Sequence, residues 1–174
     1  MSPTESTVQA EETPDWAYGV GEILEGRYEI EERIARGAYG EVHAATDRET
    51  GGRVALKVLR TDSEQRDPKA VARMRQEAEI LRALDHPNLV QVFDIGAVGE
   101  HEYLVMELLD GRSLDELIDE GDLVTPDRLR PIAAQILSAL SAMHAREVQH
   151  RDIKPENILL LERDAPGEIV KLVD

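Results

Sequence analysis

The sequence predicts an α+β fold in which an antiparallel sheet comes first and helices follow. Three observations support this prediction. Short β-prone runs alternate with turn residues between positions 28 and 59, and helical spacing of apolar residues takes over between 68 and 84. After residue 110 the pattern becomes mainly helical. At 174 residues, with 41% hydrophobic and 32% charged residues, the chain has room for one globular domain.

Composition argues against several function classes. The net charge of −16 disfavours a nucleic-acid or anionic-membrane surface, because either would need basic residues. Without cysteine there is no disulfide, thiolate zinc site or cysteine nucleophile. No apolar run reaches the roughly 18 residues of a membrane span, and the N-terminus lacks the order of a signal peptide. We therefore expect a cytoplasmic protein.

The first 26 residues differ from the rest. They are rich in Ser, Thr, Pro and Glu, contain no Lys or Arg, and show no sustained apolar periodicity. This composition predicts a disordered acidic tail over residues 1–26.

Five strands and one main helix are expected next. Strands are predicted at residues 28–34, 42–45 and 54–59, and again at 89–94 and 103–108, separated by glycine-containing turns. Between them an amphipathic helix is predicted, and its apolar stripe comprises Val71, Met74, Ala78, Leu81 and Leu84.

The region after residue 110 predicts two helices. Ser113 and Glu116 form a capping-box pattern that opens a short helix closed near Gly121. Thr125 followed by Pro126 caps a longer helix that runs to about residue 145, and Pro131 inside it predicts either a kink or a later start. We expect its apolar positions to be covered by helices beyond this sequence, and they are Ile132, Ile136, Leu140 and Met143.

One string carries the strongest chemical signal: His150-Arg-Asp-Ile-Lys-Pro-Glu-Asn157, between a helix and an apolar strand. It resembles the catalytic loop of the protein kinase family, whose serine/threonine members carry this Lys two residues after the Asp. The resemblance implies that Asp152 orients the substrate hydroxyl and accepts its proton. It also implies that Lys154 meets the γ-phosphate of ATP and that Asn157 holds Mg²⁺.

Upstream, Ala35-Arg-Gly37-Ala-Tyr-Gly40-Glu-Val42 is similar to the glycine-rich loop of that family. Ala35 replaces the first glycine, so we expect a stiffer loop in which Gly37 and Gly40 still let the backbone approach phosphates. The Lys of Val54-Ala-Leu-Lys57 matches the strand lysine that pairs with ATP phosphates. A P-loop string, G-x-x-x-x-G-K-[ST], does not occur.

The resemblance also implies an ion pair between Lys57 and a Glu on the following helix. Two candidates exist, Glu77 and Glu79. At about 100° per residue, Glu77 falls within the apolar stripe and Glu79 points to the far side, so Glu77 is predicted.

An adenine pocket and a second metal ligand are implied in the same way. Met106 matches the residue at the back of the pocket, and backbone groups near Glu107 and Leu109 would bind the base. An ordinary core strand would explain the hydrophobicity of this stretch equally well. The faces of the base would lie between side chains from the two lobes, namely Val42, Ala55 and Leu159. Asp174 matches the Asp of Asp-Phe-Gly, the second Mg²⁺ ligand.

The resulting expectation is a eukaryotic-like serine/threonine protein kinase of bacterial style. The disordered tail would be followed by an N-lobe and hinge at 27–109 and by a partial C-lobe at 110–174, which ends at the magnesium-binding Asp. Its ligands would be ATP with Mg²⁺ and a protein substrate with Ser or Thr. We expect a missing C-lobe segment or a partner chain, and a marginal or aggregation-prone isolated chain.

Two other functions stay open. A catalytically inactive kinase-like module would bind nucleotide or serve regulation, and MgATP binding without phosphate transfer would identify it. A small-molecule phosphotransferase of related fold would share the catalytic Asp and Asn, although Lys154-Pro155-Glu156 favours a protein kinase.

Overall fold

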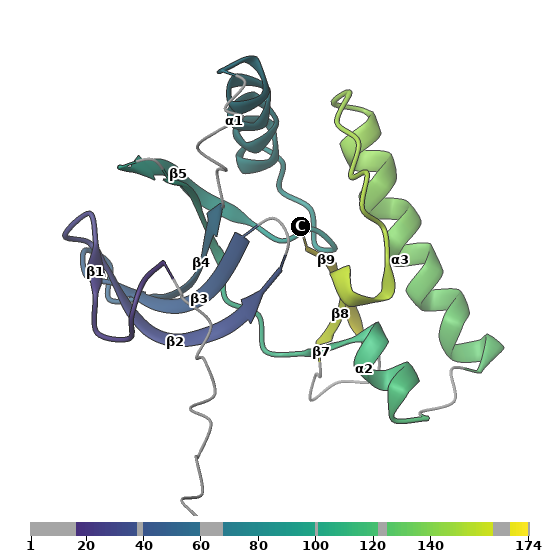
Figure 1. Cartoon of the computed structure of the whole chain (residues 1–174). Coiled ribbons are helices and arrows are strands. Elements are labelled where there is room, and N and C mark those ends of the chain that lie inside the picture. Colours follow the sequence, from purple (N-terminus) through teal and green to yellow (C-terminus); the bar gives the residue numbers. More distant parts are fainter. Residues whose placement is uncertain are drawn as a thin grey trace, which may run out of the picture.

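The fold consists of a curled antiparallel sheet joined to a smaller, mainly helical part (Figure 1). The structure is a computed structural model, and it describes residues 17–37, 40–59, 68–99, 101–121, 125–161 and 168–173. Within the helix at 68–82, the side chains of residues 68–71, 73 and 74 are outside this description, so Val71 and Met74 of the predicted stripe are not assessed. The predicted α+β, protein-kinase-like fold is confirmed.

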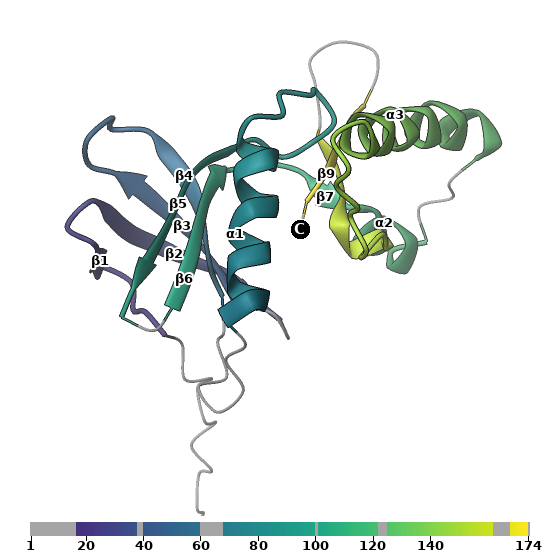
Figure 2. The same ribbon diagram turned by 90° about the horizontal axis from the view of Figure 1, so that it is seen from above.

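The larger sheet contains six strands in the order β1-β2-β3-β4-β6-β5, all pairing antiparallel. The strands are β1 (Ile23–Leu24), β2 (Tyr28–Arg36), β3 (Gly40–Asp47), β4 (Arg53–Leu59), β5 (Val92–Val98) and β6 (His101–Glu107). Five of them correspond to predicted strands, and β1 is additional. Helix α1 (Pro68–Arg82) lies against this sheet on the side of the helical part (Figure 2).

The sheet curls enough to bring the start of β2 to β5. Tyr28 in β2 donates its hydroxyl to the carboxylate of Asp94 in β5 at 3.2 Å, across 66 residues of sequence. Arg27 lies 3.6 Å from the same carboxylate and forms two 2.8 Å hydrogen bonds to Asp47. The core inside this curl consists of Leu24, Tyr28, Ile30, Ala45, Val54, Leu56, Val58, Tyr103 and Val105.

The prediction of a disordered tail is wrong for residues 17–26. This segment packs along the sheet: Leu24 pairs with Tyr28 in β1–β2 and is only 1% exposed. The hydroxyl of Tyr103 donates to Glu25 at 2.7 Å, and the backbone NH of Ala17 donates to Glu41 at 2.8 Å. Residues 1–16 lie outside the described residues, so the prediction for them is not assessed.

The helical part begins after Gly111 and contains β7 (Arg112–Ser113), α2 (Leu114–Asp119) and α3 (Pro126–His144). The capping box of Ser113 and Glu116 is present, and Thr125 caps α3 through the NH of Arg128. A 3-10 helix (Pro155–Asn157) then leads into β8 (Ile158–Leu161) and β9 (Ile169–Leu172), which form a small sheet in the order β7-β8-β9. Both predicted helix starts are thus confirmed.

Helix α3 packs differently from the expectation. Ile132 and Met143 are 2% and 3% exposed and belong to the core under β8 and β9, so they are not open to solvent. Ile136 and Leu140 are partly buried against the same core. The exposed apolar side chains of α3 are instead Leu129 and Leu137. The small sheet therefore already covers the face that we expected further helices to cover.

The two parts of the molecule meet through the segment that follows α1. The backbone NH of Val90 donates to Leu172 O, and the NH of Leu172 donates to Asn88 O, both at 2.9 Å. The buried side chain of Asn88 donates to Gln135 and to Val170 O at 2.8 Å each. These bonds fix β9 and α3 relative to the large sheet.

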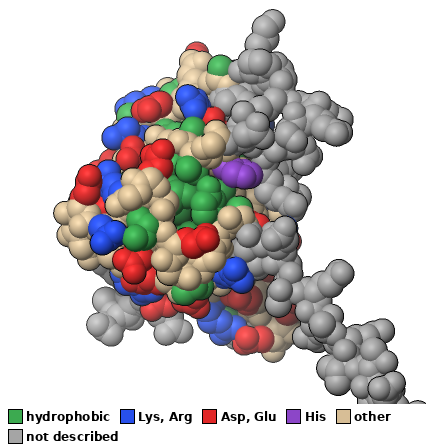
Figure 3. Space-filling view, turned by 60° about the vertical axis from the view of Figure 1, so that its left-hand side comes forward, with side chains coloured by type: hydrophobic (Ala, Val, Ile, Leu, Met, Phe, Trp, Pro, Cys, Tyr) green, Lys and Arg blue, Asp and Glu red, His purple; other side chains and the backbone are tan. Residues whose placement is uncertain are grey.

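The surface mixes charges despite the net charge of −16. On the side of the molecule in Figure 3, acidic and basic side chains alternate around a small hydrophobic group beside a histidine. Among the described residues, no helix is both long and apolar enough to cross a lipid bilayer.

Candidate functional site

The predicted adenine-binding residues line one cavity of about 250 Å³ between the two parts of the chain. Ala35 and Val42 contribute from β2 and β3, Ala55 from β4, and Leu159 from β8. The remaining lining residues come from β2, the segment before β5, β6 and the connection after it, the catalytic loop and the residue that follows β9. They are Ile34, Val90, Met106, Glu107, Leu108, Leu109, Glu156, Asn157 and Val173. Sequence analysis predicted six of these for a base pocket, and it predicted Ala35 for the glycine-rich loop and Asn157 for Mg²⁺.

Several lining residues carried no motif signal. Ile34, Val90, Leu108 and Val173 are ordinary apolar residues in the sequence. Their strand spacing offered a partial signal, since Ile34 precedes Ala35 on β2 and Val173 follows β9. These residues come together only through the placement of the two sheets relative to each other, and no local sequence pattern predicts that placement.

The glycine-rich loop joins β2 to β3, and its two glycines, Gly37 and Gly40, differ in role. Gly37 donates its NH to Gly40 O at 2.9 Å, which closes the turn. A Cβ at Gly40 would meet Val58 O at 2.2 Å, so the close packing of β3 on β4 requires glycine there. A Cβ at Gly37 would meet nothing within 4 Å. The open space is therefore at Gly37, and Ala38 and Tyr39 are outside the described residues.

The catalytic loop holds Asp152 between two donors. Lys154 Nζ lies 3.0 Å from Asp152 Oδ2, and Asn157 Nδ2 donates to the same oxygen at 3.0 Å. Asn157 Nδ2 also donates to the backbone oxygen of Asp152 at 2.9 Å. The hydrogen bond with Lys154, followed by the one with Asn157, lowers the pKa of Asp152 below its ordinary value. Asp152 is therefore a carboxylate at neutral pH.

Arg151, beside Asp152, has a left-handed backbone, with φ at 64°. This conformation is uncommon for residues other than glycine, and it clusters at functional sites. Here it lies in the loop whose end is fixed by the 3.0 Å bond from Asn157 NH to Lys154 O.

Lys57 lies on β4 and is partly buried. Burial lowers its pKa to about 8, while the negative charge of Asp152 opposes that shift and the positive charge of Lys154 adds to it. The three groups thus share one electrostatic environment although they are about 95 residues apart in sequence. The predicted convergence of Lys57 and Asp152 agrees with this mutual influence.

Glu77 on α1 faces the catalytic loop, and Glu79 does not. Glu77 Oε1 lies 3.6 Å from Nη2 of Arg151, whereas Glu79 is exposed and lies 3.9 Å from Arg82 on the same helix. Glu77 therefore lies on the side of α1 that faces the catalytic loop, as the helical phase predicted, while its role in the site stays a prediction. The partner that the structure records for Glu77 is Arg151, so its pairing with Lys57 stays a prediction.

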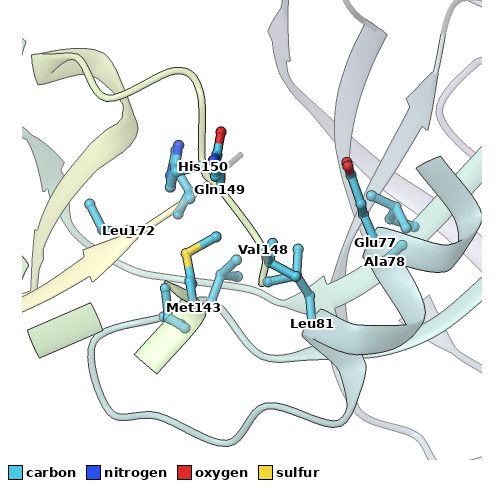
Figure 4. A pocket seen from close by; sticks show the side chains of 12 residues that line it. Glu77, Ala78, Leu81, Met143, Val148, Gln149, His150 and Leu172 are labelled. Atoms are coloured by element: carbon cyan, nitrogen blue, oxygen red, sulfur yellow. The ribbon is translucent and has the colours of Figure 1, made fainter. Parts of the chain in front are cut away.

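Glu77 also lines a second cavity, of about 180 Å³, between α1 and the catalytic loop. Leu81 and Met143 supply apolar walls, and His150 lies across from Glu77 (Figure 4). Burial lowers the pKa of His150 below its ordinary value, against an opposing effect of Asp152. His150 is therefore mainly neutral at pH 7, as a wall of an apolar cavity requires.

Of the two predicted magnesium ligands, Asn157 lies within the described residues, at the end of the catalytic loop. Among the described residues, no three His, Asp or Glu side chains gather into a cation site. Asp174, the predicted second ligand, lies outside the described residues. Mg²⁺ that binds together with a nucleotide commonly takes one or two protein ligands plus substrate phosphates, and its binding here stays a prediction.

Two lobes, a cavity between them and a loop-held Asp beside a buried Lys define the class of protein kinases. The family model for the protein kinase domain matches residues 28–174, so the chain belongs to the protein kinase family.

Several curated relatives are named as bacterial serine/threonine-protein kinases. The chain is 41% identical over 141 residues to "Probable serine/threonine-protein kinase SCO3848" of Streptomyces coelicolor, covering 79% of this chain and 21% of the relative. It is 38% identical to "Probable serine/threonine-protein kinase PknB" of Lactococcus lactis over 142 residues, which are 81% of this chain and 22% of that protein. The chain therefore spans about a fifth of these relatives.

Solved structures give the same result. The kinase domain of Mycobacterium tuberculosis PknI superposes with a TM-score of 0.77 at 26% identity, covering 90% of this chain and 61% of that domain. The expected bacterial-type serine/threonine kinase resemblance is thereby confirmed.

Proposed function

We propose that this chain is the ATP-binding and catalytic-loop part of a serine/threonine protein kinase. The observation that supports it best is the position of Asp152, which Lys154 and Asn157 hold at 3.0 Å beside the cavity that Ala55 and Met106 line. In this proposal the cavity takes adenine, and Asp152 receives the proton of a Ser or Thr hydroxyl on a protein substrate.

The phosphates of ATP would lie near the basic side chains of the site. Lys57 is a buried ammonium whose pKa of about 8 would rise again beside a phosphate, because the added negative charge favours its protonated form. Lys154 would neutralise the γ-phosphate while keeping Asp152 ionised. Gly37, with open space at its Cα, would let the backbone NH groups of its loop approach the phosphates.

Asn157 and Asp174 are the residues that would hold Mg²⁺. Because Asn157 uses its Nδ2 on Asp152, its side-chain oxygen is the atom that remains for a cation. Bound Mg²⁺ supplies positive charge that stabilises the phosphates during transfer. We further propose that the protein acts in the cytoplasm, where ATP and Mg²⁺ are abundant, and that a further C-lobe segment or a partner chain completes the substrate surface.

The test combines binding with transfer. MgATP affinity is measured by calorimetry, and transfer of labelled γ-phosphate to a generic Ser/Thr protein substrate is followed in parallel. We expect Asp152→Asn to reduce transfer by about 10² to 10⁴ while MgATP still binds. Lys57→Met should weaken MgATP binding. A parent chain that does not bind MgATP would refute the proposal, and binding without transfer would favour the nucleotide-binding module.

A further inference from the structure

A bidentate ion pair joins α1 to the large sheet. Arg75 on α1 donates from Nε to Glu102 Oε2 at 2.9 Å and from Nη2 to Glu102 Oε1 at 2.8 Å. Each of the two guanidinium nitrogens thus bonds to one oxygen of the Glu102 carboxylate on β6. Such a fork fixes orientation as well as distance, because both bonds are satisfied in only one relative placement of the two groups.

Burial makes this pair more than a surface contact. The side chain of Glu102 is 6% exposed, whereas that of Arg75 is 52% exposed. A carboxylate removed from water to this extent is strongly destabilising unless a cation hydrogen-bonds to it. Glu102 therefore holds Arg75, and with it α1, at one point above β6.

A second arginine on the same face of α1 makes a parallel contact. Arg82 follows Arg75 by seven residues, which is about two helical turns. Its Nη1 lies 3.8 Å from Asp94 Oδ1 on β5, and its backbone oxygen accepts from Gln91 Nε2 at 3.3 Å. These contacts are longer than the two hydrogen bonds of Arg75. The Arg75–Glu102 pair therefore restricts the position of α1 more tightly.

The opposite face of α1 carries Glu77. It follows Arg75 by two residues and so points about 200° away around the helix axis. There it lies 3.6 Å from Arg151 and across the 180 Å³ cavity from His150 (Figure 4). Because Arg75 and Glu77 share one turn, any rotation or lift of α1 that breaks the first contact moves the second.

We propose that Arg75 is a positioning residue that acts through α1. Its paired hydrogen bonds to Glu102 set the rotation and height of the helix, and so place Glu77 at the catalytic loop. The consequence for phosphoryl transfer rests on the proposed function, whereas the placement of α1 does not.

The placement can be measured directly, because the chain has no cysteine of its own. Spin labels are attached to the exposed positions of Gln76→Cys on α1 and Ser141→Cys on α3, and the distance between them is determined by pulsed electron resonance. Arg75→Ala alone leaves Glu102 buried and unpaired, and the chain could unfold. The informative variant is therefore the double change Arg75→Ala with Glu102→Leu, which removes the pair and the buried charge together.

We expect this double variant to keep the melting temperature of the parent while the distance distribution shifts and broadens. The matched control is Arg53→Gln, which removes a 2.8 Å Arg–Glu bond between β4 and β2, remote from α1, and should leave the distribution unchanged. A double variant with the parental distribution would overturn the proposal.

Kinetics provide a second measurement in the same variants. Transfer by the double variant should fall about tenfold in kcat with a smaller change in KM for ATP, because the nucleotide cavity is untouched. Arg75→Lys, which keeps the charge but not the fork, should give an intermediate distance distribution. If the parent chain transfers no phosphate, the proposed function fails, but the distance measurement still decides the role of Arg75.

Discussion

The carboxamide of Asn157 donates to both the backbone oxygen and the carboxylate of Asp152, at 2.9 and 3.0 Å. Asn157 is itself buried, so one side chain fixes both the loop and the rotamer of the Asp. Asn157→Ala should reduce phosphoryl transfer by about 10² or more, since the Asp loses its orientation. We also expect it to lower the free energy of unfolding in urea, because the buried Asn157 side chain and its two hydrogen bonds are lost. Arg130→Gln on exposed α3 surface is the control, and equal losses in both variants would contradict this role.

Lys57 should be unusually reactive for a lysine. With a pKa of about 8, its neutral amine is abundant at mildly alkaline pH, whereas an ordinary lysine is not. Peptide mapping after brief acylation across a pH series should show half-maximal labelling of Lys57 near pH 8. In urea-unfolded chain the same site should titrate about two units higher. A folded-state midpoint equal to the unfolded one would show that Lys57 is solvated.

The same shift gives a pH dependence of stability. Between about pH 8 and the ordinary lysine value, the unfolded chain binds more protons at Lys57 than the folded chain does. The contribution of Lys57 to stability therefore rises with pH across this window, and below pH 8 its penalty is constant. Urea unfolding of the parent should show this rise, and Lys57→Met should lack it. A parallel pH profile for the two chains would contradict the assignment.

The segment before Tyr28 should contribute to stability, although its composition predicts a disordered tail. Leu24→Ala removes a side chain that is 1% exposed, and we expect a loss of about 2 to 4 kcal/mol in the free energy of unfolding. Ile23→Ala, at the neighbouring 43% exposed position, is the matched control and should change stability little. Equal effects would mean that β1 does not dock in solution.

Self-association should depend on the outer face of α3. Leu137 is 66% exposed, so Leu137→Glu should decrease light scattering of concentrated chain without lowering its melting temperature. Ile132→Ala, on the buried face, should instead lower the melting temperature. Unchanged light scattering in Leu137→Glu would show that self-association uses a different surface.

Sequence reasoning performed best where chemistry imposes fixed spacing. Asp152, Lys154 and Asn157 form one local unit, and their mutual contacts follow from a few residues of loop. Glu77 could be chosen over Glu79 because helical phase is a local property. The outline of the large sheet was accessible for the same reason, since β-prone runs and turns alternate within short stretches.

It failed where burial depends on a distant partner. The strand β1 has two residues, too few for any period to appear, and Leu24 is buried only because the sheet curls over it. The inward face of α3 was assigned to absent helices, whereas β8 and β9 already cover Ile132. The pair of Arg75 and Glu102 spans 27 residues and matches no motif. Each of these depends on tertiary placement, which local propensity does not encode.

The bond from Tyr28 to Asp94 has a consequence for how the molecule reaches its native state. It ties β2 to β5 at the far edge of the sheet, so the curl cannot close until most of the intervening chain has been ordered. A nascent chain whose β6 has not yet left the ribosome would present the unpaired edge of β4. We expect the sheet to assemble late and cooperatively, with the Tyr28 contact forming after the rate-limiting step.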